Sequence, residues 1–247
     1  MREVKARFVT GLTATPHRRD GHHPILEMQI GPIRHVVDSR NRAATQFSRQ
    51  LVVRETRYCL LESPGAPTIQ DIYRSLAEDP GRNSMIVDDI IGAVANGRSP
   101  IVLTERRDHL ELLAAEISKA VKNVVILQGG MSEKSRHGAA RQLEEIPRDE
   151  ERVILATGRF AGEGFDDSRL DTLFLTLPVS WKGTLIQYAG RLHRHLPEKT
   201  EVQIYDYVDA GVPMLARMFE KRVKGYRAMG YEVREGRAGV SHGGRLK

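Results

Sequence analysis

The sequence predicts an α/β fold in which a doubly wound, mainly parallel sheet carries helices on both faces and follows an extended N-terminal arm. Two observations predict this fold class. Runs of Val, Ile and Leu alternate with helical patterns over residues 82–234, and continuous apolar runs are typical of strands buried on both faces of a parallel sheet. The chain has 247 residues, 40% of them hydrophobic, which is enough for one full α/β core.

The predicted elements of this domain alternate along the chain. We expect strands at residues 99–105, 123–129, 151–157, 170–177 and 201–208, and helices at residues 106–121, 131–146 and 182–196. In the first of these helices, Leu110, Leu113 and Ile117 recur at helical spacing. Further on, Met214, Leu215, Met218 and Phe219 form another helical apolar stripe, which core packing explains.

The first 80 residues contain no second complete core. Residues 5–16, 31–39 and 49–60 look like extended segments that polar stretches separate. Two helices are expected next, because Thr68 and Asp71 have the spacing of a capping box and Pro80-Gly81 interrupts the helical pattern.

The charge balance favours an anionic partner. The chain has 38 Lys and Arg residues against 32 Asp and Glu, a formal charge of +6, which favours nucleic acid or a nucleotide. Cys59 is the only cysteine, which excludes an internal disulfide and a cysteine-built zinc site and favours a reducing, cytoplasmic location. The start is too charged for a signal peptide, and no apolar run approaches the roughly 20 residues of a membrane helix.

The stretch "QYAGRLHR", residues 187–194, places four unusual residues on one helical face. A helix turns about 100° per residue, so Gln187, Gly190, Arg191 and Arg194 share a face, and Leu185, Ala189, Leu192 and Leu196 lie opposite. Two guanidinium groups one turn apart repel each other unless an anion lies between them, and their planar geometry matches phosphate. A solvated basic helix face is the alternative interpretation.

The loop after the strand at 151–157 is rich in glycine. Gly158, Gly162 and Gly164 precede Asp166, and ligands of parallel α/β sheets bind beyond the carboxyl ends of strands. The loop therefore predicts an anion cradle, although an ordinary flexible connection explains it equally well. No P-loop pattern, G-x-x-x-x-G-K-[ST], occurs in the chain.

Five stretches together resemble the motifs of superfamily 2 helicases and translocases, a family that includes the XPB-like enzymes and the motor subunits of type I and type III restriction enzymes. They are "GLTATPHRRDG" (11–21), "IVLTER", "LQGGMS", "ATGRFAGEGFD" and "QYAGRLHR", and their order matches across about 185 residues. The resemblance implies two RecA-like lobes with ATP between them. It assigns residues 1–61 to the end of lobe one and linker strands, 62–81 to a linker helix, 82–234 to the C-terminal RecA-like domain and 235–247 to a disordered basic tail.

The resemblance also implies a role for each matched position. Arg194 looks like the arginine finger, with Arg191 beside it and Gln187 sensing the nucleotide; Gly164, Asp166 and Gly190 look like ATP contacts. Thr104, Arg106, Gly129, Gly130, Thr157 and Gly158 match positions that touch the nucleic-acid backbone, and Thr13 and Thr15 match positions that couple the two sites. We expect no metal site, because the histidine pairs His22-His23 and His193/His195 have no carboxylate or cysteine at ligand spacing. Packing is the expected role of His193, Trp181 and Tyr188.

The chain departs from the family in one respect. It contains neither the P-loop nor the D-E-x-H box of lobe one, so the resemblance implies that ATP and Mg²⁺ bind in the complete two-lobe motor and that this chain alone does not hydrolyse ATP. The expected partners are DNA, with RNA possible, and the missing P-loop lobe, in the same chain or another. The rival interpretation is a standalone, non-catalytic DNA- or RNA-binding module derived from a helicase. The third interpretation is a nucleotide-binding α/β enzyme with unrelated chemistry, but the sequence contains no nucleophile–base pair or cofactor fingerprint that would support it.

Overall fold

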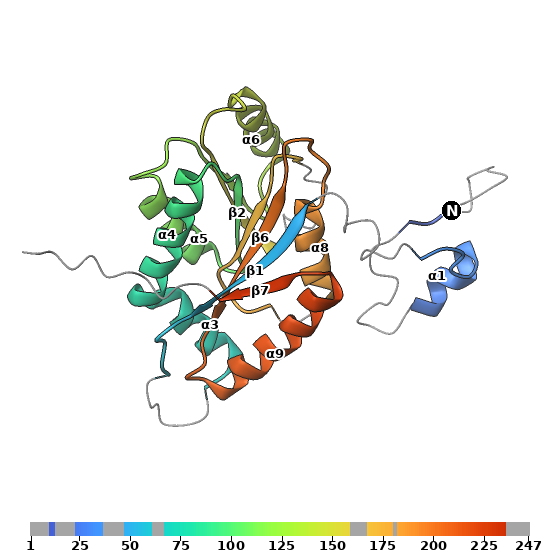
Figure 1. Ribbon diagram of the computed structural model, residues 1–247, viewed down its shortest axis with the longest axis horizontal. Helices are drawn as coiled ribbons and strands as arrows, with labels where there is room; N and C mark the ends of the chain where they lie inside the picture. Colours follow the sequence, from blue (N-terminus) through green and yellow to red (C-terminus); the bar gives the residue numbers. More distant parts are fainter. Residues whose placement is uncertain are drawn as a thin grey trace, which may run out of the picture.

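Seven parallel strands form the centre of the structure (Figure 1). In this computed structural model, residues 10–12, 23–36, 47–60, 67–158, 167–179 and 182–235 are described. The strands are β1 (Ser48–Glu55), β2 (Pro100–Thr104), β3 (Val124–Leu127), β4 (Val153–Thr157), β5 (Thr172–Leu175), β6 (Glu201–Val208) and β7 (Glu232–Glu235). Their order in the sheet is β3-β4-β2-β5-β6-β1-β7, and every neighbouring pair is parallel.

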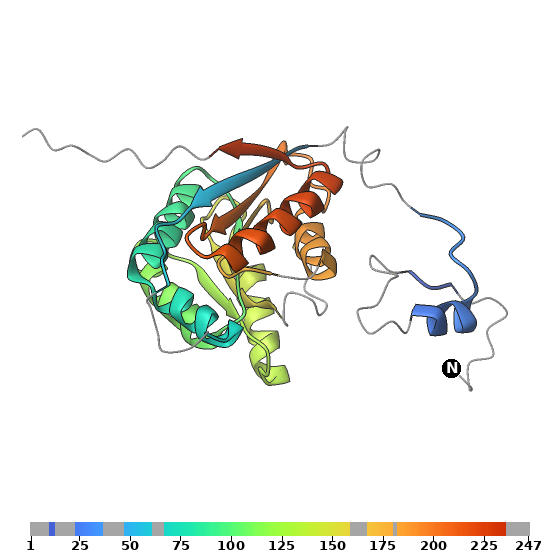
Figure 2. The same ribbon diagram turned by 90° about the horizontal axis from the view of Figure 1, so that it is seen from below.

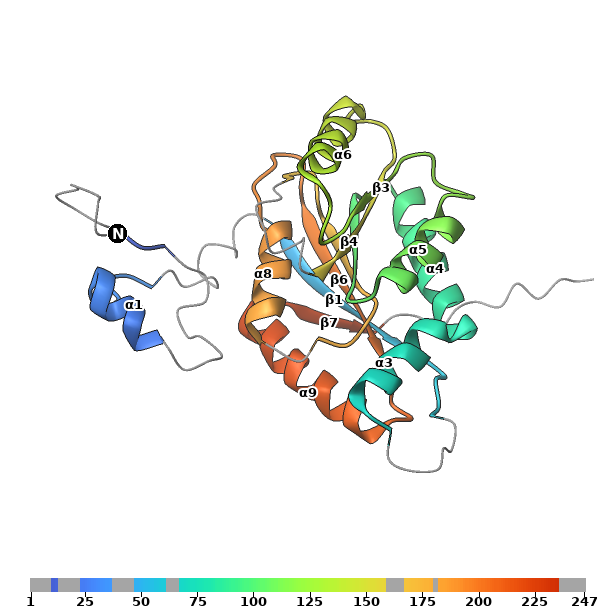
Figure 3. The same cartoon turned by 180° about the vertical axis from the view of Figure 1, so that it is seen from behind.

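Helices cover both faces of this sheet. Helices α4 (Pro80–Ala95) and α5 (Arg107–Ile117) pack on one face, and α6 (Glu133–Glu145), α8 (Lys182–Leu192) and α9 (Pro213–Ala228) on the other. Figures 1 and 3 show α4 and α5 across the sheet from α8 and α9. The connections that run toward β3 pass through α4 and α5, and those that run toward β7 pass through α6, α8 and α9, as right-handed crossovers require. The predicted α/β fold, RecA-like and doubly wound, is confirmed.

The continuous apolar runs are strands with two buried faces, as predicted. Every residue of β2, β4 and β5 is buried. Ile101 and Leu103 of β2 contact the core beneath α6, α8 and α9, whereas Val102 between them contacts the core beneath α4 and α5. Side chains alternate across a strand, so both helical layers need apolar residues from the same strand.

The two helices before β2 begin as the sequence predicts. Helix α3 (Ile69–Glu78) starts with a capping box in which the Thr68 hydroxyl accepts from the Asp71 amide and the Asp71 carboxylate accepts from the Thr68 amide. Asp79 then caps α4, whose first residue is Pro80. Pro80 cannot continue α3 but suits the first turn of a new helix.

Two strands differ from the sequence prediction. Residues 48–55 were assigned to the linker strands before the main domain, but β1 lies inside the main sheet and pairs with β6 along eight residues and with β7 on its other side. The buried Leu51 explains this position, because it packs in the core beneath α8 and α9. The short edge strand β7 was not predicted, since "EVRE" has no apolar run.

The N-terminal arm was predicted as extended, but it contains a helix, α1 (His23–Ile30). Residues 10–12 and 31–36 form neither helix nor strand, and the rest of the strand expected at 5–16 lies outside the described residues. Within the described ranges, no helix is long and apolar enough to cross a lipid bilayer.

Candidate functional site

The carboxyl ends of β3 and β4 are joined by a hydrogen bond between two predicted site residues. The Gly129 amide donates to Thr157 Oγ1 at 2.8 Å. Thr157 is the last residue of β4 and is only 7% exposed, while Gly129 follows β3. The hydroxyl therefore fixes the backbone of the loop that follows the neighbouring strand.

At the end of β2, the predicted site residue Thr104 is turned inward. It is 3% exposed, and its Oγ1 lies 3.0 Å from His109 Nδ1 and accepts from the Arg106 amide at 3.3 Å. His109 Nε2 in turn faces Asn83 Oδ1 at 2.9 Å. The Thr104 side chain thus orders the backbone that leads to Arg106.

The protonation of His109 settles the direction of these bonds. Burial, helped by the charge of Arg82, lowers the pKa of His109 to about 4, so the ring is neutral at pH 7. The amide of Asn83 is oriented by its own donation to the Ala77 carbonyl, so Asn83 Oδ1 accepts from His109 Nε2. His109 Nδ1 is then the acceptor for the Thr104 hydroxyl. The sequence alone does not mark His109 as a site residue, because its partner Asn83 lies in another helix.

The N-terminus of α5 lies between two predicted groups of site residues. Arg106 precedes the helix and makes no capping hydrogen bond with its own side chain; it pairs with Asp108 (Nη2 to Oδ2, 2.5 Å), whose Oδ1 accepts from the His109 amide at 2.9 Å. The Arg107 guanidinium donates to the Gly129 carbonyl. Gly130 has a φ of +83°, and a Cβ there would lie 2.9 Å from Arg107 Nη2. A helix N-terminus flanked by arginines suits a phosphate.

Gly158 fills a narrow space between two side chains that sequence analysis did not assign to the site. A Cβ at Gly158 would overlap both Tyr188 Oη and Glu105 Oε1. Tyr188 is 4% exposed and donates to Glu105 Oε1 at 3.5 Å. Burial raises the pKa of Tyr188, with a contribution from the Glu105 carboxylate, so the phenol keeps its proton. Its packing role, expected from the sequence, is confirmed.

The predicted arginine face is only partly on a helix. Gln187 and Gly190 are exposed on α8 and Arg191 is half-buried. The helix was expected to continue to residue 196, but it ends at Leu192, so the exposed Arg194 lies in the turn that follows.

A buried lysine explains why α8 ends there. Lys199 is 8% exposed, and its Nζ donates to the carbonyls of Leu170 (2.7 Å), Leu192 (3.1 Å) and Arg194 (3.0 Å). Burial lowers the pKa of Lys199, and the carboxylates of Asp171 and Asp167 act against this shift. The ammonium donates to carbonyl oxygens that would accept from backbone amides if the helix continued.

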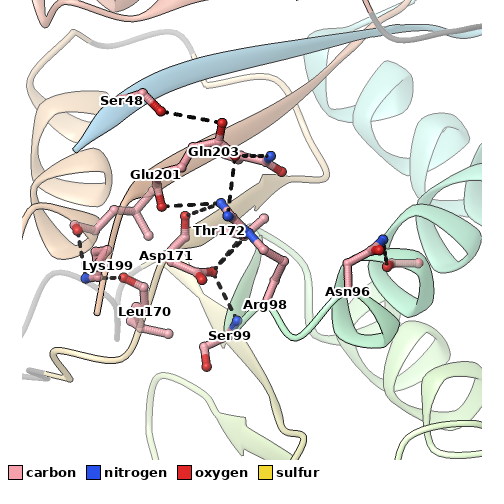
Figure 4. Close-up of polar contacts among 12 residues, drawn as sticks. Ser48, Asn96, Arg98, Ser99, Leu170, Asp171, Thr172, Lys199, Glu201 and Gln203 are labelled. Carbon is pink, nitrogen blue, oxygen red and sulfur yellow. Dashed lines mark hydrogen bonds and ion pairs between the residues drawn. The ribbon is translucent and has the colours of Figure 1, made fainter. Parts of the chain in front are cut away.

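The structure places Arg194 and the strand-end residues at different edges of the sheet. Leu170 and Lys199 lie two residues before β5 and β6, at the amino ends of the strands (Figure 4). Thr104, Thr157 and Gly129 lie at the carboxyl ends. Helix α8 runs back along the sheet between the two edges, so Tyr188 reaches Glu105 while Arg194 does not lie with this group.

Ion pairs close the amino edge around the turn that carries Arg194. Arg98 pairs with Asp171 (Nε to Oδ1, 3.5 Å) and with Glu201 (Nη1 to Oε1, 3.4 Å), which ties the starts of β2, β5 and β6 together (Figure 4).

Other predicted positions fall into two classes. Thr13, Thr15, Gly164, Asp166 and also Trp181 lie outside the described residues. His193 contacts the Tyr231 hydroxyl (3.0 Å) and the rings of Phe47 and Tyr231. Burial lowers the pKa of His193 to about 4, and its ring contacts confirm the packing role expected from the sequence. Where side chains are described, no three His, Cys, Asp or Glu residues come together as a metal site.

The part of the chain that carries these site residues is similar to known proteins. Residues 83–196 match the family model described as the helicase conserved C-terminal domain. The chain is 26% identical over 238 residues to the putative helicase 161L of Invertebrate iridescent virus 6, covering 92% of this chain and 51% of that protein. It is 28% identical over 141 residues to the transcript termination protein A18 of Fowlpox virus, covering 56% of this chain and 30% of the viral protein.

A solved structure agrees on the fold. The crystal structure of T4 UvsW superposes with a TM-score of 0.58 at 16% identity, covering 77% of this chain and 41% of that chain. The chain spans about half, or less, of the length of each of these relatives.

Proposed function

We propose that this chain, which carries the C-terminal lobe of a superfamily 2 helicase, supplies half of an ATP-driven nucleic-acid motor. In this proposal the carboxyl edge of the sheet holds the nucleic-acid backbone, and the turn after α8 delivers arginines to ATP that a P-loop lobe binds. The observation that carries it is the convergence of the predicted strand-end residues at one edge, where Thr157 holds the Gly129 amide.

The carboxyl edge suits phosphate groups. The N-terminus of α5 lies there, with Arg106 and Arg107 beside it and Gly129 and Gly130 opposite. Backbone amides, a helix N-terminus and guanidinium groups recognise phosphate without reading bases. Binding is therefore expected to be largely independent of sequence, to accept DNA or RNA and to weaken steeply with salt.

The other edge suits the terminal phosphate of a nucleotide held by a second lobe. Arg191 and Arg194 are the proposed fingers, Gln187 and Gly190 line the same stretch, and Lys199 anchors the turn of Arg194. Most of the contacts to ATP and all of the Mg²⁺ ligands belong to the P-loop lobe in this proposal. The chain alone is then expected to have no ATPase activity.

The test is reconstitution. The chain is mixed with a separately produced P-loop lobe of the same protein, nucleic acid and ATP. We expect ATPase activity that needs both lobes and that Arg194→Ala lowers by about a thousandfold or more, the usual worth of an arginine finger. Arg141→Ala is the matched control, because Arg141 is an exposed arginine paired with Glu145 on α6. A reconstituted pair that hydrolyses ATP equally well with Arg194→Ala contradicts the proposal.

The rival function, a standalone nucleic-acid-binding module, draws support from the same strand-end cluster, which this chain holds by itself. Filter binding separates the two. A module binds nucleic acid tightly alone and gains nothing from the P-loop lobe, whereas half a motor binds weakly until the second lobe completes the channel.

A further inference from the structure

A row of exposed cations runs along one side of α9. Arg217, Lys221 and Lys224 are exposed, and at about 100° per residue they fall within an arc of about 60°. Arg227 is exposed one turn further along and lies about 60° outside this arc. These four residues are called the α9 stripe. Figure 2 shows α9 on the outside of the sheet, beside α8.

The cations of the α9 stripe are not balanced within the part of the chain that the structure describes. None of the four makes an ion pair there, whereas exposed basic residues elsewhere do, as in the pairs Lys119–Glu116, Lys122–Glu150 and Arg141–Glu145. Glu220 is the one acidic residue of α9. A helix with four exposed cations and one carboxylate repels itself unless an external anion lies against it.

The remaining basic residue of α9 has a different, structural role. Arg222 is buried and forms a bidentate ion pair with Asp206 (2.7 and 2.8 Å), and Tyr226 donates to the same carboxylate. The opposite, apolar side of the helix is buried too, through Leu215 and the close approach of Gly225 to Leu185. The α9 stripe is therefore not needed to hold the helix in place.

The chemistry of the α9 stripe narrows the class of partner. Among the described residues of α9, no large hydrophobic side chain is exposed. A membrane-binding helix needs apolar side chains to enter the lipid, and protein interfaces draw their affinity from aromatic or aliphatic anchors. Cations alone, on a rigid helix and spread over about 15 Å along its axis, match the regular charges of a phosphate backbone.

We infer that the α9 stripe is a second nucleic-acid contact, separate from the carboxyl edge, which holds the phosphate backbone of a duplex or strand beside α8. The inference goes beyond the proposed function, because it concerns a different surface and requires neither ATP nor the second lobe. Such a contact keeps the nucleic acid attached when the carboxyl edge releases it.

The test uses the full chain and fluorescence anisotropy with a short labelled DNA duplex and a short single strand at several salt concentrations. Lys221→Glu/Lys224→Glu is expected to weaken binding and to lower the slope of log affinity against log salt by about 2, one for each lost phosphate contact. Lys119→Glu/Lys122→Glu is the control, because it changes the net charge equally at the far end of α5. Thermal unfolding shows whether each variant is folded.

The outcomes separate this inference from the proposed function. If Lys221→Glu/Lys224→Glu and the control change the slope equally, or if Arg107→Glu at the carboxyl edge alone abolishes all binding, the α9 contact is wrong. If the chain binds vesicles of phosphatidylserine through Lys221 and Lys224 but binds no nucleic acid, it is also wrong. If Lys221→Glu/Lys224→Glu lowers the slope of log affinity against log salt, the α9 contact is supported even when the two lobes show no reconstituted ATPase activity. Absence of that ATPase activity counts only against the proposed motor function.

Discussion

Thr157 holds the amide of Gly129 at 2.8 Å, so the end of β4 sets the shape of the loop after β3. Replacing Thr157 by Val keeps the volume but leaves that amide without its acceptor. We expect a loss of about 1 kcal/mol in the free energy of unfolding and weaker nucleic-acid binding, because Gly129 and Gly130 are no longer held. Thr157→Ser keeps the hydroxyl and should restore both. Urea unfolding and filter binding measure the two effects. Unchanged nucleic-acid binding by the Val variant would show that this loop is not part of the nucleic-acid surface.

Gly158 has no room for a side chain. Its Cβ would overlap Tyr188 Oη and Glu105 Oε1; the glutamate is exposed and can move, but Tyr188 is packed in the core. Gly158→Ala should therefore destabilise the protein by about 1 to 3 kcal/mol. Tyr188→Phe removes the overlapping hydroxyl, so the double variant should recover part of the loss and show a coupling that separate sites lack. Additive effects in urea unfolding would contradict this account.

The strands of the sheet that are buried on both faces could be predicted from the sequence. β2 and β4 are continuous apolar runs, and all of their residues are buried. β7 was missed because most of its residues are charged, so it has no such run. The place of β1 was also missed, since pairing between residues 48–55 and 201–208 is a long-range contact that local patterns do not encode.

The site was predictable where it depends on glycines and hydroxyls at strand ends, and not where it depends on buried polar contacts. Thr157 and Gly129 were expected at one edge and meet there. The support of Thr104 by His109, and of Arg194 by Lys199, depends on partners that only the fold brings together. The end of α8 was misplaced for the same reason, because the apolar spacing continues to Leu196 while Lys199 stops the helix at Leu192.

Acid should destabilise this protein through two histidines, the buried His109 and the half-buried His193. The pKa values of His109 and His193 are lowered to about 4 in the folded protein, against about 6.5 in an unfolded chain. Between these values the unfolded state binds protons that the folded state does not, so stability is full above pH 6.5 and falls as the pH drops toward 4. The loss is at most about 3 kcal/mol for each histidine.

The variant His193→Phe should flatten this pH dependence. Phe keeps the ring contacts with Phe47 and Tyr231 but cannot take up a proton. About half of the loss between pH 6.5 and 4 should disappear, at the expense of the hydrogen bond with the Tyr231 hydroxyl. Urea unfolding at several pH values measures it, with His137→Phe on the exposed side of α6 as control. An unchanged slope would assign the acid sensitivity to other groups.

Lys199→Met should loosen the turn that carries Arg194. The substitution fills most of the same space but leaves the carbonyls of Leu170, Leu192 and Arg194 without their shared donor. Hydrogen bonds to a charged group are worth about 1.5 to 3 kcal/mol, so we expect a destabilisation of about 2 kcal/mol or more. Lys119→Met, at an exposed lysine paired with Glu116, should change stability by no more than about 0.5 kcal/mol.

The same variant tests whether the turn matters for catalysis as well as for folding. In the reconstituted pair of lobes, a displaced Arg194 should lower kcat and leave the KM for ATP nearly unchanged, because a finger acts mainly in the transition state. Hydrogen exchange should accelerate more at the amides of residues 193–195 than at the core amides of β2 and β4, whose exchange follows the loss of global stability. A variant that loses stability throughout but keeps kcat below its unfolding temperature would reduce Lys199 to a structural role and leave Arg194 positioned by other contacts.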